Sequence, residues 1–354
     1  MGHNRRNPGL SILLIVAAVT GPLLSPGRAR ALADRFGMNT LSVMSGNATQ
    51  VETIYAAMQE RGVTWIRADL EWSGIEGSKG NFTWARADIA VDRARSHGIN
   101  VLATLDYTPA WARTNQTSDH YPPDDPDDYA AFAKAAVLRY KDRVHEWEIW
   151  NEPNYWRFWL PKPDVTAYTT LLKKAYTAMK SVDPTATVMV GGLTPSGGAN
   201  RATTFLQGIY DRNGGTSNGL FDAVAWHPYC KTEKPTRSTD SWCAWYQMNG
   251  ADPSGRSIMV AHGDAAKQIW PTEYGVCTGG IGDLATSELR QAADMKDAYD
   301  GAGILPYLGP LFWHNWQDLS GDQTQRSYNF CGLTTVDGTK KASWYKYRHL
   351  ARTG

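Results

Sequence analysis

Short apolar runs alternate along the chain with longer amphipathic segments. Eight of the runs have the Val, Ile, Leu, Phe and Trp content of buried β-strands. They span residues 36–40, 64–68, 100–105, 146–150, 187–191, 223–226, 268–272 and 311–313. The clearest amphipathic segment covers 168–179, where apolar residues repeat with the helical period before Asp183-Pro184 ends the pattern. The pattern therefore predicts strands and helices in alternation.

Further helices are predicted over 51–61, 84–96 and 129–140, the last one preceded by Asp127 and Asp128 in N-cap position. Alternating strands and helices form a parallel sheet, and eight such units close into a (β/α)₈ barrel. The competing fold is an open doubly wound sheet, but no G-x-G-x-x-G turn follows the first strand. The predicted fold class is α/β, with a single TIM barrel.

The N-terminal segment, residues 1–33, has the features of a secretory signal. Arg5 and Arg6 precede an apolar run at 10–24, and small residues suited to cleavage follow at 29–33. An uncleaved membrane anchor is the alternative. No other stretch approaches the ~18 apolar residues of a membrane span. We expect a catalytic domain over 34–354, secreted or associated with the cell envelope, with no stable membrane span after cleavage.

Charge and composition narrow the choice of partner. The 36 Lys and Arg nearly cancel the 35 Asp and Glu in a chain of 354 residues, without long runs of one sign. This balance argues against nucleic acid, which selects a basic surface. The 15 Trp residues suit a carbohydrate, because an indole face packs on the C–H face of a sugar. The oligomeric state is left open, with a monomer favoured.

Four cysteines are an even number suited to two disulfides in an exported protein, with three possible pairings. Cys230 and Cys243 flank a polar segment and could staple it, which leaves Cys277 with Cys331. The spacing matches no zinc signature. The acidic stretch 122–128 could bind calcium, but a capped helix start explains it more simply. We expect no metal and no cofactor.

Polar residues gather where the predicted strands end, which is where a (β/α)₈ barrel builds its active site. The fourth strand ends in Asn151-Glu152 and the seventh in Glu273. Glycoside hydrolysis needs two carboxyl groups about the scissile bond, and strands four and seven lie nearly opposite each other across a barrel mouth. Glu152 is therefore the predicted general acid/base and Glu273 the predicted nucleophile. Glu148 is expected to be a buried structural carboxylate.

These residues also carry a resemblance. The segment Trp150 to Asn154, Trp-Asn-Glu-Pro-Asn, resembles the acid/base motif of the retaining clan that contains glycoside hydrolase families 5 and 39. Thr272-Glu273-Tyr274-Gly275 resembles its nucleophile motif, and the likeness covers about 36–350. One departure stands out, because family 5 members commonly have a histidine at the third strand end where this chain has Asp106 and Tyr107.

The resemblance implies roles for further residues at the strand ends. It places Arg67 near the nucleophile, His227 and Tyr229 as a pair on the sixth strand, and Trp313 as a sugar-stacking platform. Arg67 could instead be a structural partner of a barrel carboxylate, and His227 and Tyr229 could be core residues. The full set expected to bind substrate is Arg67, Asp69, Trp111, Asn151, His227, Tyr229 and Trp313. Trp156 and Trp159 could line the leaving-group side.

The predicted activity is that of a retaining glycosidase that cleaves β-linked glycosidic bonds by double displacement. Candidate substrates are β-glycans, xylosides and galactofuranose-containing glycans of cell walls or exopolysaccharides. The alternatives are a transglycosylase that uses the same residues, a carbohydrate-binding barrel without activity and a structural or adhesive envelope protein. Sequence does not decide between pyranoside and furanoside, or between exo and endo action.

Overall fold

The computed structural model describes residues 1–2, 34–40, 48–231, 234–282 and 285–353. The predicted signal segment lies almost wholly outside these residues. Eight strands form one sheet. They are β1 (Phe36–Asn39), β2 (Trp65–Glu71), β3 (Asn100–Asp106), β4 (Glu146–Asn151), β5 (Thr187–Leu193), β6 (Ala223–Trp226), β7 (Ile269–Pro271) and β8 (Leu311–Trp313).

The sheet runs in the order β7-β6-β5-β4-β3-β2-β1-β8, and every neighbouring pair is parallel. It closes just beyond the ends of β7 and β8. There the Tyr274 N–H donates to the Phe312 carbonyl at 2.9 Å and the His314 N–H to the Tyr274 carbonyl at 2.7 Å. The predicted (β/α)₈ barrel is thereby confirmed.

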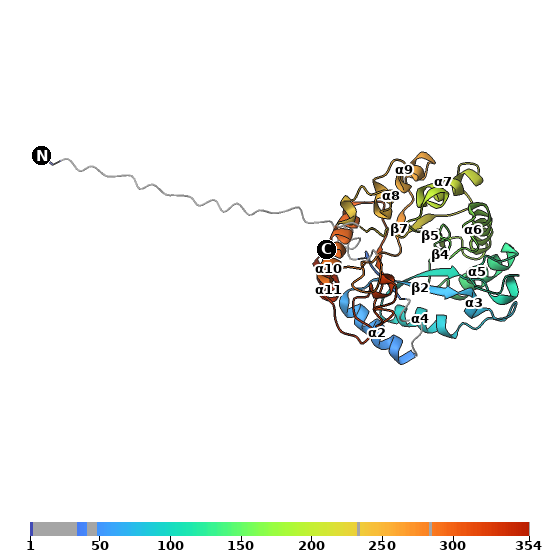
Figure 1. Cartoon of the computed structure of the whole chain (residues 1–354), viewed down its shortest axis with the longest axis horizontal. Helices are drawn as coiled ribbons and strands as arrows, with labels where there is room; N and C mark the ends of the chain where they lie inside the picture. Colours follow the sequence, from blue (N-terminus) through green and yellow to red (C-terminus); the bar gives the residue numbers. More distant parts are fainter. Residues whose placement is uncertain (3–33, 41–47, 232–233, 283–284, 354) are drawn as a thin grey trace.

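Helices surround the barrel (Figure 1). They are α2 (Ala48–Arg61), α3 (Trp72–Ile75), α4 (Ala85–Ser96), α5 (Pro126–Tyr140), α6 (Val165–Lys180), α7 (Ala202–Arg212), α8 (Ala244–Asn249), α9 (Gly255–Ala261), α10 (Glu288–Ile304) and α11 (Ala342–Thr353). No helix among the described residues is long and apolar enough to cross a membrane.

The start of α5 corrects the sequence prediction. The N-cap is Asp125, whose side chain accepts a hydrogen bond from the Asp127 N–H, whereas Asp127 and Asp128 lie in the first turn. Pro126 explains the shift, because its fixed φ and missing N–H suit the first helical position. The acidic stretch is thus a helix start, as predicted.

The apolar core has two parts, one on each side of the strands. The larger part packs the outer faces of the strands against the helices. The smaller part fills the inside of the barrel and comprises Leu102, Met189, Ala223, Ala225, Trp270 and Phe312, with Trp65 packed against it. Because strand side chains alternate between faces, the next inward residues along β2, β6 and β8 are Arg67, His227 and His314. Polar side chains therefore occupy the carboxyl end of the barrel.

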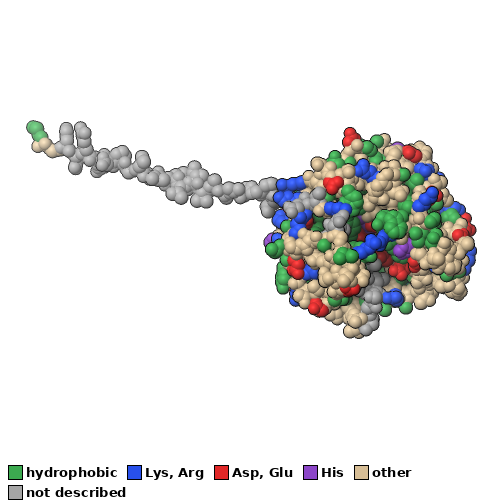
Figure 2. All heavy atoms as spheres, viewed as in Figure 1, with side chains coloured by type: hydrophobic (Ala, Val, Ile, Leu, Met, Phe, Trp, Pro, Cys, Tyr) green, Lys and Arg blue, Asp and Glu red, His purple; other side chains and the backbone are tan. Residues whose placement is uncertain are grey.

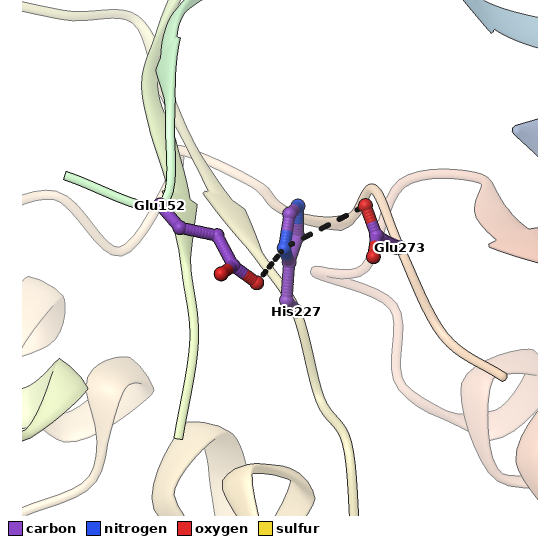
Figure 3. Close-up of side chains that lie close together, drawn as sticks. All are labelled: Glu152, His227 and Glu273. Carbon is purple, nitrogen blue, oxygen red and sulfur yellow. Dashed lines mark hydrogen bonds and ion pairs between the residues drawn. The ribbon is translucent and has the colours of Figure 1, made fainter. Parts of the chain in front are cut away.

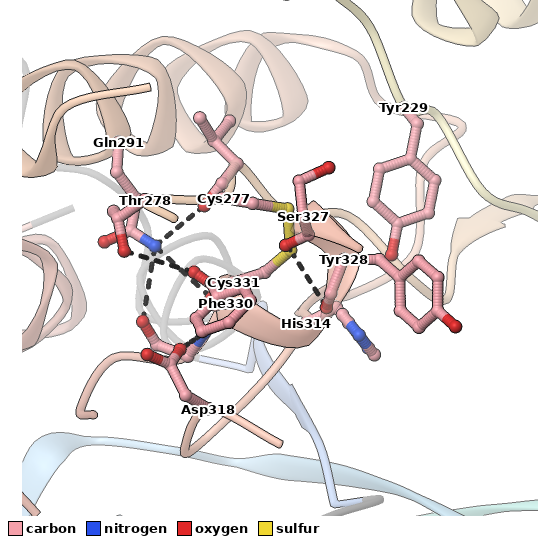
Figure 4. Close-up of a disulfide and its surroundings, with 12 residues drawn as sticks. Tyr229, Cys277, Thr278, Gln291, His314, Asp318, Ser327, Tyr328, Phe330 and Cys331 are labelled. Carbon is pink, nitrogen blue, oxygen red and sulfur yellow. Dashed lines mark hydrogen bonds between the residues drawn. A yellow bond between two sulfur atoms is a disulfide. The ribbon is translucent and has the colours of Figure 1, made fainter. Parts of the chain in front are cut away.

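Both disulfides have the predicted pairing, Cys230–Cys243 and Cys277–Cys331. The second one joins the segment after β7 to the loop between β8 and α11, and Figure 4 shows its surroundings. Around it, the Gln291 side chain donates to the Val276 carbonyl at 2.7 Å and the Lys341 ammonium to the Phe330 carbonyl at 3.1 Å. The two segments are therefore held together by covalent and polar contacts.

The loop lengths predict unequal costs for removing the two disulfides. In the chain-entropy model, a bridge across 54 residues contributes about 4 kcal/mol and one across 13 residues about 3 kcal/mol. We expect Cys277→Ser/Cys331→Ser to lower the free energy of unfolding more than Cys230→Ser/Cys243→Ser, as measured by urea denaturation. A larger loss from the shorter bridge would contradict this account.

Candidate active site

A pocket of about 710 Å³ opens at the carboxyl ends of the strands. Figure 2 shows a hollow in this face, with acidic side chains visible inside it and basic, histidine and hydrophobic side chains around it. Six of the sequence-predicted residues line the pocket: Arg67, Asp69, Asn151, Glu152, Tyr229 and Glu273. The fold thus brings most of the predicted site together from β2, β4 and the segments that follow β4, β6 and β7.

Glu152 and Glu273 face each other across His227 (Figure 3). Nδ1 of His227 lies 2.9 Å from Oε1 of Glu152 and 3.9 Å from Oε2 of Glu273. One ring nitrogen of His227 and one carboxylate oxygen of each glutamate all lie within 4.8 Å of one another. Carboxyl groups ~5–5.5 Å apart are typical of retaining glycosidases, whereas ~6.5–9.5 Å is typical of inverting ones. The spacing therefore fits retention.

Glu273 is surrounded by groups that favour its ionised form. The Tyr229 hydroxyl donates to Oε1 at 2.5 Å, and the Arg67 guanidinium lies 3.5 Å from Oε2. Burial by itself would raise the pKa of Glu273, but His314, His227, Arg67 and the Tyr229 hydrogen bond outweigh it and lower this pKa to about 2. Burial lowers the pKa of His314, so near neutral pH the permanent charge beside Glu273 is that of Arg67.

Arg67 connects the two halves of the site. Nε and Nη2 donate to the two oxygens of Glu148 at 2.9 and 3.0 Å, and Nη2 also donates to Oδ1 of Asn151 at 2.9 Å. Nη1 lies 3.5 Å from Asp69. Glu148 is fully buried and paired, as the sequence predicted. Arg67 therefore has both the structural partner and the contact to Glu273 that the sequence presented as alternatives.

His227 packs directly on the backbone of β5. A Cβ at Gly192 would lie 2.1 Å from Nε2 of His227, so only glycine leaves room for the ring. The Gly192 N–H donates to Oε1 of Glu148 at 2.8 Å, and Nε2 of His227 lies 3.9 Å from the same oxygen. Burial would lower the pKa of His227, but Glu273 and Glu152 raise it overall. The imidazole is thus placed between three carboxylates.

The backbone is strained beside the pocket. Among the described residues, four non-glycine positions have positive φ, and three of these are Tyr107, Trp150 and Glu152. The side-chain amide of Asn154 holds the strand-four segment in place: it donates to the Thr194 and Asn200 carbonyls at 2.8 and 2.9 Å. Asn154 is fully buried, so this last residue of the motif positions the loop that carries Glu152.

A second pair of carboxyls, Asp69 and Asp106, lies beside Arg67. Burial raises the pKa of Asp69 to about 6, against the opposing charge of Arg67. Asp106 is fully buried, and neither of its oxygens has a hydrogen-bond partner among the described residues. Burial, followed by the charge of Asp69, raises its pKa well above the ordinary value and so favours its uncharged form.

Trp313 and Trp111 do not line the pocket. Phe312 and His314 point into the barrel, so Trp313 points outward, where it is fully buried, donates to the Cys331 carbonyl at 3.1 Å and packs edge-on against Tyr274. This corrects the expectation of a stacking face at Trp313. The Trp111 indole donates to the Glu76 carbonyl at 2.7 Å and packs against Trp72.

Several lining residues were not predicted. His314 directly follows β8, and its Nδ1 lies 3.6 Å from Oε1 of Glu273. Aromatic residues from the loops also line the pocket, namely Tyr107, His120, Tyr155, Trp156, Phe158, Trp242 and Tyr328. Of the two tryptophans left open, Trp156 is in the lining and half exposed, whereas Trp159 is buried. The signal for His314 was its place directly after the eighth strand.

The same three residues Glu152, His227 and Glu273 form the only group in the described part of the chain with the spacing of a metal site. Their atoms already have protein partners. Nδ1 of His227 is bonded to Glu152, and Oε1 of Glu273 accepts from Tyr229. The arrangement is that of two opposed carboxylic groups with distinct environments, which suits acid and nucleophile roles.

The pKa of Asp69 predicts a pH-dependent stability. A carboxyl whose pKa is raised from 3.8 to about 6 stabilises the fold below pH ~4, and this contribution is lost as pH rises through about 6. We expect Asp69→Asn to gain stability relative to the wild type between pH 4 and pH 8, by up to about 3 kcal/mol. Urea denaturation at several pH values measures the difference.

Glu273 supplies the matched control with the opposite sign. Its lowered pKa stabilises the fold above pH ~4.5, and that contribution is lost as pH falls toward about 2. Glu273→Gln should therefore lose stability relative to the wild type at neutral pH and recover it in acid. A pH-independent difference for Asp69→Asn would contradict the raised pKa.

Comparisons with known proteins agree with this geometry. The family model described as Cellulase (glycosyl hydrolase family 5) matches residues 30–317, which is most of the chain. No curated protein has significant similarity to the sequence. Many solved structures do, and those described next are less than 25% identical to this chain, so they show the fold alone.

A family 39 glycoside hydrolase from Bacteroides cellulosilyticus WH2 has a TM-score of 0.72 and 23% identity, and the match covers 91% of this chain and 64% of that one. The chain thus spans slightly less than two thirds of that protein.

Two further structures have the same fold. A monomeric β-xylosidase from Caulobacter crescentus CB15 has a TM-score of 0.68 and 18% identity, with coverage of 91% and 68%. A GH5_18 protein from Bifidobacterium longum subsp. infantis has a TM-score of 0.66 and 14% identity, with coverage of 90% and 78%. The chain belongs to the Cellulase family (glycosyl hydrolase family 5) and is built on a (β/α)₈ barrel.

Proposed function

We propose that the protein is an exported enzyme that cleaves β-linked bonds of an oligo- or polysaccharide, with Glu273 as nucleophile and Glu152 as general acid/base. The observation that carries the proposal is the pair of carboxyls within 4.8 Å, one of them held ionised by Arg67 and Tyr229. Such a pair is what double displacement through a glycosyl-enzyme intermediate needs.

In the first step, Glu273 attacks the anomeric carbon while Glu152 donates a proton to the departing glycosidic oxygen. His227 contacts only Oε1 of Glu152, which leaves Oε2 without a protein partner among the described residues and available to the leaving group. Asn151, fixed by Arg67, lies beside the acid where it can hydrogen-bond a sugar hydroxyl. The acid and the nucleophile are therefore positioned by separate contacts.

In the second step, Glu152 acts as a base and removes a proton from water, which attacks the anomeric carbon and releases Glu273. Esterification of Glu273 removes its negative charge, while Arg67 keeps its two-point contact with Glu148. Tyr229 can then donate to the ring region of the sugar instead of the carboxylate. The same groups serve both half-reactions.

The loops favour an extended carbohydrate. Trp156 and Tyr328 are half exposed on the pocket lining, and Trp242 lies with them. Aromatic faces pack on sugar rings, so these side chains form platforms beyond the catalytic pair.

Xylosides are among the candidate substrates, since the Caulobacter neighbour is a β-xylosidase. Export is supported by the two disulfides and by the apolar run at 10–24.

Variants of the two carboxyls test the roles. Glu273→Ala should lower turnover of aryl β-glycosides by about 10⁴-fold or more, because no intermediate can form. Glu152→Ala should spare substrates with good leaving groups far more than poor ones, with azide restoring part of the rate. Proton NMR of the first product should show retained anomeric configuration.

Glu146 offers a matched control, because it begins the same strand that Asn151 ends. Glu146→Gln should keep turnover close to the wild type. The assignment would be wrong if Glu273→Ala kept near-wild-type activity, or if Glu152→Ala lost good and poor leaving groups equally.

The Tyr229 hydrogen bond gives a separate prediction. Tyr229→Phe removes a donor to Oε1 of Glu273, so the pKa of Glu273 should rise from about 2 and the acid limb of kcat/KM should move to higher pH. A hydrogen bond to a charged group is worth about 1.5–3 kcal/mol, which predicts a loss in kcat of roughly 10- to 100-fold. Tyr155→Phe is the control, since Tyr155 lines the pocket without a hydrogen bond to either carboxyl. An unmoved acid limb would contradict the role of Tyr229.

A further inference from the structure

The charges on the pocket lining are unevenly distributed. Among the described residues, the only acidic ones on the lining are Asp69, Glu152 and Glu273, and all three lie in the deep cluster around Arg67 and His227. Two further arginines, Arg157 and Arg326, also line the pocket. Neither forms a salt bridge or donates a side-chain hydrogen bond to any residue in the described part of the chain. Within the part of the chain that the structure describes, the positive charge of the outer lining thus has no acidic partner.

Arg157 is the more buried of the two. It lies in the loop between β4 and α6, and its Nε is buried without a hydrogen-bond partner. The guanidinium lies 5.4 Å from the centre of the Trp156 ring, and the Arg157 carbonyl accepts from Nδ1 of His120 at 2.6 Å. Arg157 as a whole is partly exposed, but leaving its buried Nε without a hydrogen bond is costly, and an anionic ligand that accepts from this atom would offset that cost.

Arg326 is exposed, but its backbone is fixed. The residues on either side of it, Gln325 and Ser327, each make a backbone hydrogen bond with Ile281, at 2.9 and 3.0 Å. The Cys277–Cys331 disulfide anchors the same loop, which also carries Tyr328 on the pocket lining. Arg326 therefore extends from a held segment, so ordering it on a ligand costs only side-chain entropy.

The two arginines approach the pocket from opposite sides. In a ring ordered β1 to β8, β4 and β8 are four strands apart in either direction, so the loops that follow them face each other across the mouth. Arg157 follows β4 and Arg326 follows β8. An extended sugar chain that crosses the catalytic pair can meet a cation on each side.

On this geometry, and resting on the glycosidase function proposed above, we propose that the substrate is an anionic glycan. Arg157 and Arg326 bind negatively charged substituents of the sugars on the two sides of the scissile bond. Carboxylate and sulfate groups share the required chemistry, since the guanidinium fork donates two parallel N–H bonds to the oxygens of either group. Trp156 and Tyr328 provide the apolar faces beside these cations.

Binding to an inactive variant tests the proposal apart from catalysis. The probes are oligosaccharides that carry glucuronic acid and the same oligosaccharides after reduction of each carboxylate to a primary alcohol, titrated calorimetrically into Glu273→Gln. We expect the acidic form to bind at least about tenfold more tightly, with a preference that falls as salt is raised. Equal affinities, or no binding of either form, would overturn the proposal when the sulfated probe described below also fails to bind more tightly than its unsulfated counterpart.

Arginine variants assign the contact. In the Glu273→Gln background, Arg157→Gln and Arg326→Gln should each weaken binding of the acidic oligosaccharide about tenfold and leave the reduced one nearly unchanged. Lys134→Gln, on the outer shell in α5, removes the same charge as a control and should change neither affinity. Unchanged thermal unfolding verifies that each variant is folded. Loss in the Lys134 variant equal to that in the arginine variants would also overturn the proposal.

The remaining probe is an oligosaccharide of neutral sugars that carries sulfate esters. Tight binding of this probe without tight binding of the uronic acid form supports the anionic class and assigns the group to sulfate. The glycosidase function is judged separately, by hydrolysis of neutral aryl glycosides with the wild-type protein. A protein that hydrolyses those substrates but shows no preference for acidic oligosaccharides would keep the proposed function and lose this inference.

Discussion

The guanidinium of Arg67 is the group on which the rest of the site depends. It is buried at the centre of the barrel mouth and holds Glu148 in a two-point contact, Asn151 through a shared donor, and Asp69 and Glu273 at 3.5 Å. A buried cation is tolerated only when its donors are matched by well-placed acceptors. A lysine could not replace it, because a point charge lacks the planar fork that contacts both oxygens of Glu148.

Arg67 is a single charge among several carboxyls, so these carboxyls differ in how readily they take up a proton. Burial raises the pKa of Asp69 to about 6 and that of Asp106 well above its ordinary value. Glu273 has the Tyr229 hydroxyl and the arginine together, so it remains ionised. As pH falls, Asp69 and Asp106 therefore take up protons before the nucleophile does.

The position of Glu152 requires a strained backbone at the end of β4. Trp150 and Glu152 have positive φ on either side of Asn151, a conformation that the surrounding contacts must enforce. Asn154 secures the loop beyond, and Gly192 allows His227 to approach the strand-five backbone. The apolar side chains packed inside the barrel, among them Trp270 and Phe312, support these polar groups from the interior. Substrate contacts farther out come from loops that the strands position.

Sequence alone determined the elements and most of the catalytic centre. Periodic apolar runs predicted the barrel, and the rule that strand ends carry the site led to Glu152 and Glu273. The resemblance to known glycosidases implied Arg67 and Tyr229. The barrel is confirmed, and the structure brings these four residues to one pocket. These features could be predicted from the sequence because they depend on residue order, and because a barrel of this kind places its site at the carboxyl ends of the strands.

Tertiary structure decided what depends on side-chain direction and on the meeting of distant loops. Both faces of a parallel strand are buried, so an apolar strand such as β8 does not reveal which of Trp313 and His314 points inward. The start of α5 moved to Asp125 because Pro126 could occupy the first turn. Arg157 and Arg326 are 169 positions apart in the numbering, and only barrel closure places them on one pocket. The sequence specified which chemical groups the protein has, and the closed barrel determined which of these groups meet in one pocket.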